Sequence, residues 1–118
     1  MTSPFFRRII CLIQHIPCGK VTSYGALATH AGNSRAAREV ARILHSSTER
    51  YKLPWHRIVN KQGCIVLAGE GFTTQRTLLE NEGISVADNG CIPASFFWDF
   101  EDTHFDDDEY DADDAPGL

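Results

Sequence analysis

The chain has 118 residues, of which 42% are hydrophobic and 23% are charged. This composition excludes a fibrous or wholly disordered protein and leaves room for one domain with a modest core. No apolar run approaches the roughly 20 residues of a membrane span, and the start lacks the apolar core of a secretory signal. We therefore expect an intracellular protein with no membrane partner, in the cytoplasm (at the nucleoid) of a bacterium or the nucleus of a eukaryote.

The net charge of −5 is the average of two opposite parts of the chain. All eleven Lys and Arg residues lie in residues 1–87 beside five acidic residues, whereas residues 88–118 contain the other eleven acidic residues and no basic one. A basic body predicts a polyanionic partner such as nucleic acid. We expect a folded domain over residues 1–98 and a disordered acidic tail over residues 99–118, because the tail has too few apolar residues to form a core.

The cysteines are spaced too widely for a zinc motif or for the dense disulfide framework of a small secreted domain. There are four of them, Cys11, Cys18, Cys64 and Cys91. We expect four reduced thiols, no metal site and no other cofactor.

Two helices are predicted at the start of the chain. Ser3 can cap the first, Pro4 suits its first position, and Pro17 ends the apolar pattern that follows at helical spacing. Ser23 can cap a second, short helix, and Gly32 ends it as a C-terminal glycine does.

A third helix is predicted from residue 33 or 34 to about Leu44. Its apolar stripe lies opposite a basic stripe formed by Arg35, Arg38 and Arg42. Two short helices joined at a glycine, with a basic outer face, predict a helix-turn-helix that binds DNA.

The second half of the chain predicts a hairpin and one more helix. Residues 58–59 and 64–67 flank the turn residues 61–63, which indicates a small β-hairpin. Thr73 or Thr74 can cap a last helix that ends at Gly83. After residue 88, four apolar residues form a patch that can pack against residues 1–87: Ile92, Phe96, Phe97 and Trp98. The sequence thus predicts a mainly α fold, a winged helix-turn-helix DNA-binding domain with a small β-hairpin wing.

Five strings of residues, in a fixed order, are more specific than this periodicity. They are Ile16-Pro17-Cys18-Gly19-Lys20-Val21, Ser23-Tyr24-Gly25 with Leu27-Ala28, Ala36-Ala37-Arg38, Pro54-Trp55-His56-Arg57-Ile58-Val59 and Leu78-Leu79-Glu80-Asn81-Glu82-Gly83. From about Phe5 to Trp98 the chain resembles the C-terminal, DNA-binding domain of O6-alkylguanine-DNA alkyltransferases. The resemblance implies a partner, double-stranded DNA that contains O6-alkylguanine.

One residue departs from that resemblance. Active alkyltransferases carry the alkyl-accepting cysteine where this chain has Trp55, and a tryptophan there is the mark of alkyltransferase-like proteins, which bind alkylated DNA without repairing it. An indole offers no thiolate to attack the alkyl group. His56 and Glu82 match the family's base and its orienting carboxylate, so they form a relay without an acceptor. The resemblance therefore implies a protein that is not an enzyme.

The resemblance also implies roles in turning the damaged nucleotide out of the duplex. Arg38 would fill the gap left in the base stack, although a solvated arginine is the alternative, and Tyr24 would crowd the 3′ phosphate. The small Ala36 and Ala37 would let the third helix lie in the minor groove, although helix propensity also explains alanine there. Two further side chains would contact phosphates: Arg35 and Arg42.

A base pocket is implied as well, formed by Tyr24, Trp55, Ile58 and the loop Leu67-Ala68-Gly69. Active members usually have a tyrosine where Ala68 stands, and the smaller side chain predicts tolerance of large adducts. We expect a monomer that flips and holds O6-alkylguanine and marks it for nucleotide excision repair proteins. Two alternatives remain: an active alkyltransferase that uses Cys18 or Cys64, and a winged-helix regulator that reads undamaged sequence.

Overall fold

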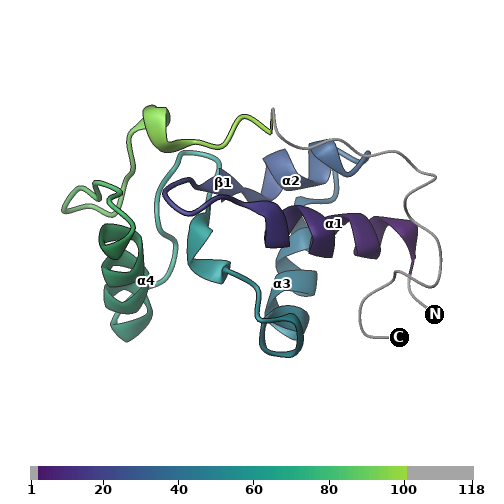
Figure 1. Ribbon diagram of the computed structural model, residues 1–118, viewed down its shortest axis with the longest axis horizontal. Coiled ribbons are helices and arrows are strands. Elements are labelled where there is room, and N and C mark those ends of the chain that lie inside the picture. Colours follow the sequence, from purple (N-terminus) through teal and green to yellow (C-terminus); the bar gives the residue numbers. More distant parts are fainter. Residues whose placement is uncertain (1–2, 101–118) are drawn as a thin grey trace.

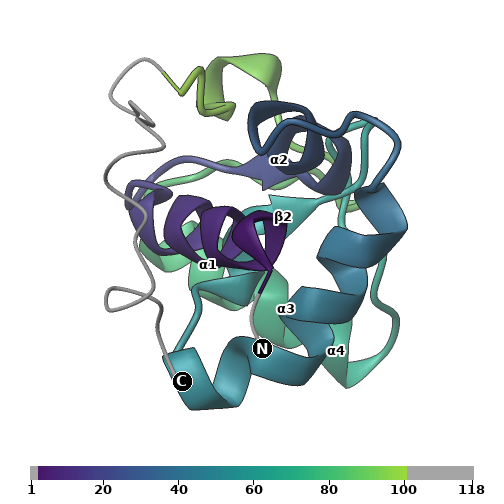
Figure 2. The same ribbon diagram turned by 90° about the vertical axis from the view of Figure 1, so that its right-hand side faces the viewer.

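The computed structural model describes residues 3–100. Its elements, with η for a 3-10 helix, are α1 (Pro4–His15), β1 (Thr22–Ser23), α2 (Tyr24–His30), α3 (Ala37–Tyr51), η1 (Trp55–Arg57), β2 (Ile58–Val59), α4 (Glu70–Asn81) and η2 (Ala94–Phe96). The fold is mainly helical, as the sequence predicts. Helices α1, α2 and α3 gather together while α4 lies at the other end (Figure 1). The turned view shows α1 next to α2 and α3 (Figure 2), and α2 and α3 also pack directly on each other. The sequence predicts a disordered tail over residues 99–118, and from residue 101 onward this tail lies outside the described residues.

The first two helices begin where the sequence predicts. The Ser3 hydroxyl accepts a hydrogen bond from the Phe6 amide at 3.0 Å, and Pro4 occupies the first position of α1. The Ser23 hydroxyl caps α2 through the Ala26 amide at 3.1 Å. After α2, Gly32 has a φ of 102°, a conformation that favours glycine and turns the chain towards α3. Within residues 3–100 no helix has the length and apolar character to cross a membrane.

Helix α3 begins later than predicted, at Ala37 instead of residue 33 or 34. Residues 33–36 form a turn instead. The Arg35 amide donates to the Asn33 side chain at 3.1 Å, and the Ala36 amide donates to the Asn33 carbonyl at 3.1 Å. Asn33 therefore satisfies amides that a helix start would leave unpaired, which delays the helix by one turn.

Helix α3 also ends later than predicted, at Tyr51 instead of about Leu44. The polar residues that predict a loop are helical, and the hydroxyls of two of them bond to carbonyls of the preceding turn. Ser46 donates to the Ile43 carbonyl at 3.3 Å and Thr48 to the Leu44 carbonyl at 2.5 Å. The Tyr51 ring then packs edge-on against Phe6 of α1, which holds the last turn on the body.

The small sheet pairs strands other than those predicted. Strand β1 pairs in parallel with β2, with Thr22 opposite Ile58 and Ser23 opposite Val59. The predicted turn at residues 61–63 does form, closed by a hydrogen bond from the Gly63 amide to the Asn60 carbonyl at 2.9 Å. Strand β1 is buried, so its backbone needs a partner, and β2 supplies it.

The prediction of four reduced thiols is wrong for two of them. The chain after the turn pairs with residues 90–92 through an antiparallel bridge that sets Cys64 opposite Cys91, and these two form a disulfide across 27 residues. Two hydrogen bonds flank it, from the Ile65 amide to the Gly90 carbonyl and from the Ile92 amide to the Gly63 carbonyl, both at 2.9 Å. Spacing along the chain does not reveal this pairing because two separate loops create it.

Helix α4 begins at Glu70, three or four residues before the predicted cap at Thr73 or Thr74. Gly69 precedes it with a φ of 61°, and both the amide and the hydroxyl of Thr73 bond to the Gly69 carbonyl. Thr73 therefore lies one turn inside the helix. This earlier start shortens the loop that leads into α4.

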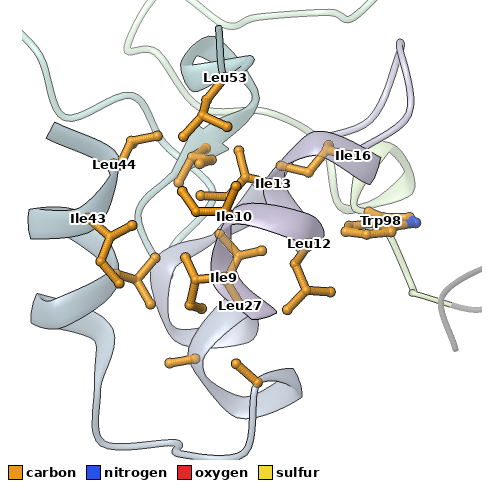
Figure 3. Close-up of a cluster of buried hydrophobic side chains, with 14 of the residues drawn as sticks. Ile9, Ile10, Leu12, Ile13, Ile16, Leu27, Ile43, Leu44, Leu53 and Trp98 are labelled. Carbon is orange, nitrogen blue, oxygen red and sulfur yellow. The ribbon is translucent and has the colours of Figure 1, made fainter. Parts of the chain in front are cut away.

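The core consists of two clusters. The first joins α1, α2 and α3, and its sticks in Figure 3 include Ile9, Ile10, Leu12, Ile13, Ile16, Leu27, Ile43, Leu44, Leu53 and Trp98. The second lies between the sheet, α4 and the chain after it, and contains Val21, Val59, Ile65, Leu79, Ile84, Val86 and Ile92. The strands β1 and β2 thus link two packed regions, and the face between them holds the candidate site.

The predicted docking of the apolar patch after residue 88 is confirmed. Ile92 joins the second cluster and Trp98 the first, while Phe96 and Phe97 pack partly buried against the second. Phe100 is also buried: its ring stacks on Trp98 at 4.1 Å and on His30 at 3.8 Å. The packed body therefore extends through Phe100.

Candidate nucleic-acid interface

Three arginines lie exposed around the turn between α2 and α3. Arg35 lies in the turn, and Arg38 and Arg42 lie on the outer side of α3. Arg42 forms an ion pair with Glu39 at 3.7 Å, and the Arg42 side chain is 76% exposed. Such an exposed pair contributes little stability, so this guanidinium is available to a phosphate.

The two alanines beside these arginines are both half-buried. Ala36 packs against the first core cluster, whereas Ala37 opens α3. A larger side chain at Ala36 would therefore disturb the core, and the packing reason for a small residue there stands beside the implied fit to a groove.

A cavity of about 410 Å³ lies between α2, α3, η1 and the loop before α4. Four predicted pocket residues line it: Tyr24, Trp55, Ile58 and Leu67. Six others complete its lining: Ala41, Leu44, His45, Thr48, Val66 and Gln75. The volume is within the usual range for small-molecule sites, and the walls are mostly apolar.

Two predicted pocket residues, Ala68 and Gly69, do not line this cavity. Both are exposed, and because α4 begins at Glu70 the chain turns away directly after Leu67. They directly follow Leu67, which does line the cavity. The roles predicted for Ala68 and Gly69, and the tolerance of large adducts predicted from Ala68, stay predictions.

Helix α3 supplies residues that sequence analysis missed. Ala41, Leu44, His45 and Thr48 follow the spacing of one helix face, and all four line the cavity. The helical spacing of these residues is visible in the sequence. However, a helix predicted to end at about Leu44 leaves His45 and Thr48 out of this face. Val66 is exposed and also lines the cavity; it directly follows Ile65, a buried residue of the second core cluster.

Trp55 is half-buried at the start of η1, directly after Pro54. Its ring packs partly against the first core cluster and meets the His56 ring edge-on, with centroids 6.2 Å apart. The indole thus forms one wall of the cavity. The position that the resemblance assigns to the alkyl acceptor therefore opens on the pocket.

Tyr24 is half-buried at the first position of α2 and lines the same cavity. Burial raises the pKa of the Tyr24 hydroxyl above its ordinary value, which keeps the hydroxyl neutral at physiological pH. The group can therefore donate a hydrogen bond to an acceptor such as a phosphate oxygen.

Behind the cavity wall, the Glu82 carboxylate binds groups from three parts of the chain. It accepts hydrogen bonds from the His56 Nε2 atom at 2.6 Å, from the Gly19 amide at 2.8 Å and from the Arg57 guanidinium at 2.8 Å. Arg57 also donates to the Ile16 carbonyl at 2.9 Å. The predicted pairing of His56 with Glu82 is thus present in the structure.

Burial opposes ionisation of Glu82, but the hydrogen bonds from Arg57, Gly19 and His56 outweigh it and lower the pKa of the carboxyl to about 2. The carboxylate is therefore charged and fixes the orientation of His56. Arg57 is a residue that sequence analysis missed. Two features of the sequence could have indicated it: Arg57 directly follows His56, and residues 1–87 contain only five acidic residues with which an arginine can pair.

No other catalytic constellation appears among residues 3–100. Cys11 and Cys18 are free and do not line the cavity, and Cys64 is bonded to Cys91. The described residues contain no group of three His, Cys, Asp or Glu side chains that could hold a metal ion.

The model of the DNA-binding domain of 6-O-methylguanine DNA methyltransferases matches residues 4–84. The chain belongs to this family. The DNA base-flipping protein of Escherichia coli (strain K12), a similar protein, is 43% identical over 88 residues, which cover 75% of this chain and 68% of that protein. Alkyltransferase-like protein 1 of Schizosaccharomyces pombe is 33% identical over 86 residues, or 70% of this chain and 78% of that protein.

A solved structure of the methyltransferase family supports the fold. It is S. pombe Atl1 in complex with damaged DNA containing O6-carboxymethylguanine, with a TM-score of 0.68 and 28% identity over 83% of this chain and 98% of that chain. The family resemblance and the winged-helix fold predicted from the sequence are confirmed.

Proposed function

We propose that this protein binds duplex DNA containing O6-alkylguanine, turns the damaged nucleotide out of the helix and holds it without removing the alkyl group. One observation carries the proposal. The Trp55 indole lines the cavity next to the His56–Glu82 pair, where an alkyltransferase requires a thiolate. Supporting it, one similar protein is named a DNA base-flipping protein, and another was solved with damaged DNA.

The absence of transfer follows from the chemistry of the available nucleophiles. Attack on the alkyl carbon needs a lone pair that a neighbouring base can release, and the indole nitrogen is a hydrogen-bond donor. Cys64 is bonded to Cys91, and the two free thiols, Cys11 and Cys18, lie outside the cavity lining. In this proposal His56 and Glu82 hold the pocket rather than activate a nucleophile.

Binding would use the exposed arginines and the cavity together. The O6 edge of guanine cannot enter a protein pocket while the base is stacked in the duplex, so the nucleotide must rotate outward. Arg38 would occupy the space left in the stack, Tyr24 would press on the 3′ phosphate, and Arg35 and Arg42 would contact phosphates. The base would then lie between Trp55 and α3.

Because the alkyl group stays on the DNA, the complex would mark the lesion. We propose that the protein acts as a monomer with the genomic DNA, at the nucleoid of a bacterium or in the nucleus of a eukaryote, and passes the lesion to nucleotide excision repair proteins.

The test compares binding to a duplex with one O6-methylguanine and to the same duplex with guanine, at a stated salt concentration. Mass spectrometry of the protein after incubation follows any transfer. We expect tighter binding to the lesion duplex and no change in protein mass. A mass gain of one methyl group would favour an alkyltransferase that uses another cysteine, and equal affinity for both duplexes would favour a regulator that reads undamaged sequence.

A further inference from the structure

The buried floor of the cavity contains one polar side chain. Of the ten lining residues, Leu44, Ile58 and Gln75 are buried, with Gln75 only 2% exposed. The other polar lining groups, Tyr24, His45 and Thr48, are half-buried or exposed. A ligand that enters the cavity fully therefore meets Gln75 at its deepest part.

The Gln75 amide has a fixed orientation. Its Nε2 atom donates to the His56 carbonyl at 3.0 Å and to the Ile58 carbonyl at 3.0 Å, which uses both amide hydrogens. These two carbonyls flank Arg57 on the segment that carries Trp55, so Gln75 fastens that segment to α4. Rotating the amide would place an oxygen against two carbonyl oxygens, so this orientation is the stable one.

The remaining group of this amide is its oxygen. Within residues 3–100 the Gln75 Oε1 atom accepts no hydrogen bond. This oxygen is not among the fully buried unpaired polar atoms of the described residues, so water reaches it, and a ligand that brings a donor replaces that water. The cavity therefore presents a fixed acceptor on an otherwise apolar floor.

O6-alkylguanine has one kind of donor that fits this acceptor. Alkylation of O6 removes the hydrogen from N1, so the exocyclic 2-amino group carries the only N–H bonds that the base itself retains. We infer that the Gln75 amide oxygen accepts a hydrogen bond from the 2-amino group of the flipped base and makes Gln75 a specificity-determining residue. This inference rests on the proposed function. It identifies the Gln75 amide oxygen as the group that selects bases carrying a 2-amino group, as guanine does.

The test combines a change in the protein with a change in the base. Wild-type protein, Gln75→Leu and a matched control, Gln14→Leu, are each titrated with duplexes containing O6-methylguanine, guanine or O6-methylhypoxanthine, which lacks the 2-amino group. Gln14 is an exposed residue of α1, so the control makes the same chemical change outside the cavity. Thermal unfolding confirms that each variant is folded.

We expect wild-type protein and Gln14→Leu to bind O6-methylguanine about fivefold tighter than O6-methylhypoxanthine, the ratio of one neutral hydrogen bond. In Gln75→Leu the ratio falls to about one. Because Gln75 also fastens the Trp55 segment, both affinities fall in this variant, but a purely structural role would lower them together and leave the ratio unchanged.

A second variant covers the case in which Gln75→Leu does not fold. Gln75→Lys keeps donors for the His56 and Ile58 carbonyls and has no acceptor, so its ratio should also be about one. Two results would overturn the assignment of Gln75 and leave the proposed function standing. The first is a folded Gln75 variant that still binds O6-methylguanine about fivefold tighter than O6-methylhypoxanthine. The second is wild-type protein that binds these two duplexes equally but prefers O6-methylguanine to guanine. Equal wild-type binding to O6-methylguanine and guanine would overturn the proposed function and this inference with it.

Discussion

Glu82 connects parts of the chain that are far apart in sequence. Its carboxylate holds the Gly19 amide after α1, and His56 and Arg57 in η1, from its own place after α4. The side chain is 11% exposed, so solvent screens these contacts weakly. One residue thus joins the two core regions and orients the wall of the pocket.

This contact predicts a dependence of stability on pH. The pKa of Glu82 is lowered from 4.5 to about 2 in the folded protein, so its ionised form adds stability that is fully present above about pH 4.5 and is lost as the pH falls towards 2. The shift corresponds to roughly 3 kcal/mol. In urea unfolding at a series of pH values, Glu82→Gln should be less stable than wild type by about this amount at neutral pH, and the difference should shrink below about pH 4.5.

The control for this prediction is Glu80→Gln, which removes a carboxylate that is 47% exposed and pairs with Arg76 at the surface. Its effect on stability should be small at every pH. A deficit of Glu82→Gln that stays constant between neutral pH and about pH 3 would show that the charge of Glu82 does not stabilise the fold.

Replacing Trp55 with cysteine places a thiol beside the His56–Glu82 pair. We expect Trp55→Cys to gain slow methyl transfer from O6-methylguanine DNA, measured as a mass increase of one methyl group. The rate should stay below that of a true alkyltransferase, because active members usually have a tyrosine where Ala68 stands. The double variant Trp55→Cys with His56→Ala should lose this activity. A Trp55→Cys rate equal to that of a true alkyltransferase would show that the residue at position 68 does not limit transfer.

Arg38 and Arg42 lie one turn apart on α3, yet we expect different effects from their removal. Arg38→Ala should weaken binding to lesion DNA selectively and reduce flipping, because a group that fills the base stack acts on the flipped state. Arg42→Ala should weaken binding to damaged and undamaged DNA alike, since a phosphate contact is indifferent to the base. A fluorescent base analogue at the target position reports flipping. Unchanged flipping in Arg38→Ala would make Arg38 a solvated surface arginine.

At the scale of elements, the starts of α1 and α2 could be predicted because Ser3 and Ser23 cap through contacts only three residues away. The pairing of β1 with β2 and the Cys64–Cys91 disulfide could not, since each depends on segments that meet through the tertiary fold. The same reason applies to the site. The His56–Glu82 pair followed from the resemblance, whereas Gln75 became part of the pocket through packing of α4.

The disulfide gives a prediction about the loop after β2. Cross-linking two residues 27 positions apart restricts the unfolded chain, and reduction should lower the free energy of unfolding by about 3 kcal/mol. Urea unfolding with and without a reductant measures the loss, and thiol labelling confirms reduction. The double variant Cys64→Ser, Cys91→Ser should match the reduced protein and no longer respond to reductant, whereas Cys18→Ser should respond as wild type does. Equal stabilities of oxidised and reduced wild type would contradict the prediction.

At the scale of the whole molecule, the described part of the chain ends next to the helix-turn-helix, just before the acidic residues 101–118. Phe100 stacks on His30, the last residue of α2, so the chain leaves the described body beside the turn that carries Arg35. Residues 101–118 contain nine acidic side chains and no basic one. Two roles are open to them: competition with DNA for the exposed arginines, and solubility alone.

Deleting residues 101–118 distinguishes these roles. If the acidic residues compete, the tether gives them an effective concentration of ~1 mM near the arginines, and deletion should tighten binding to undamaged DNA severalfold at low salt. The gain should shrink as salt screens the charges, and it should be smaller for lesion DNA, where the pocket contacts favour displacement. Affinities measured at about 50 mM and about 200 mM salt test this. Equal affinities of full-length and shortened protein at both concentrations would leave solubility as the role.

The two tryptophans occupy very different surroundings. Trp98 is 6% exposed in the core, while Trp55 is half-buried at the cavity wall. The fluorescence emission of an indole depends on the polarity of its surroundings and on stacking. A base that enters the cavity therefore changes the emission of Trp55, whereas the emission of Trp98 stays constant. The chain therefore carries its own optical probe of pocket occupancy, and Trp55→Phe supplies the spectrum of the silent residue.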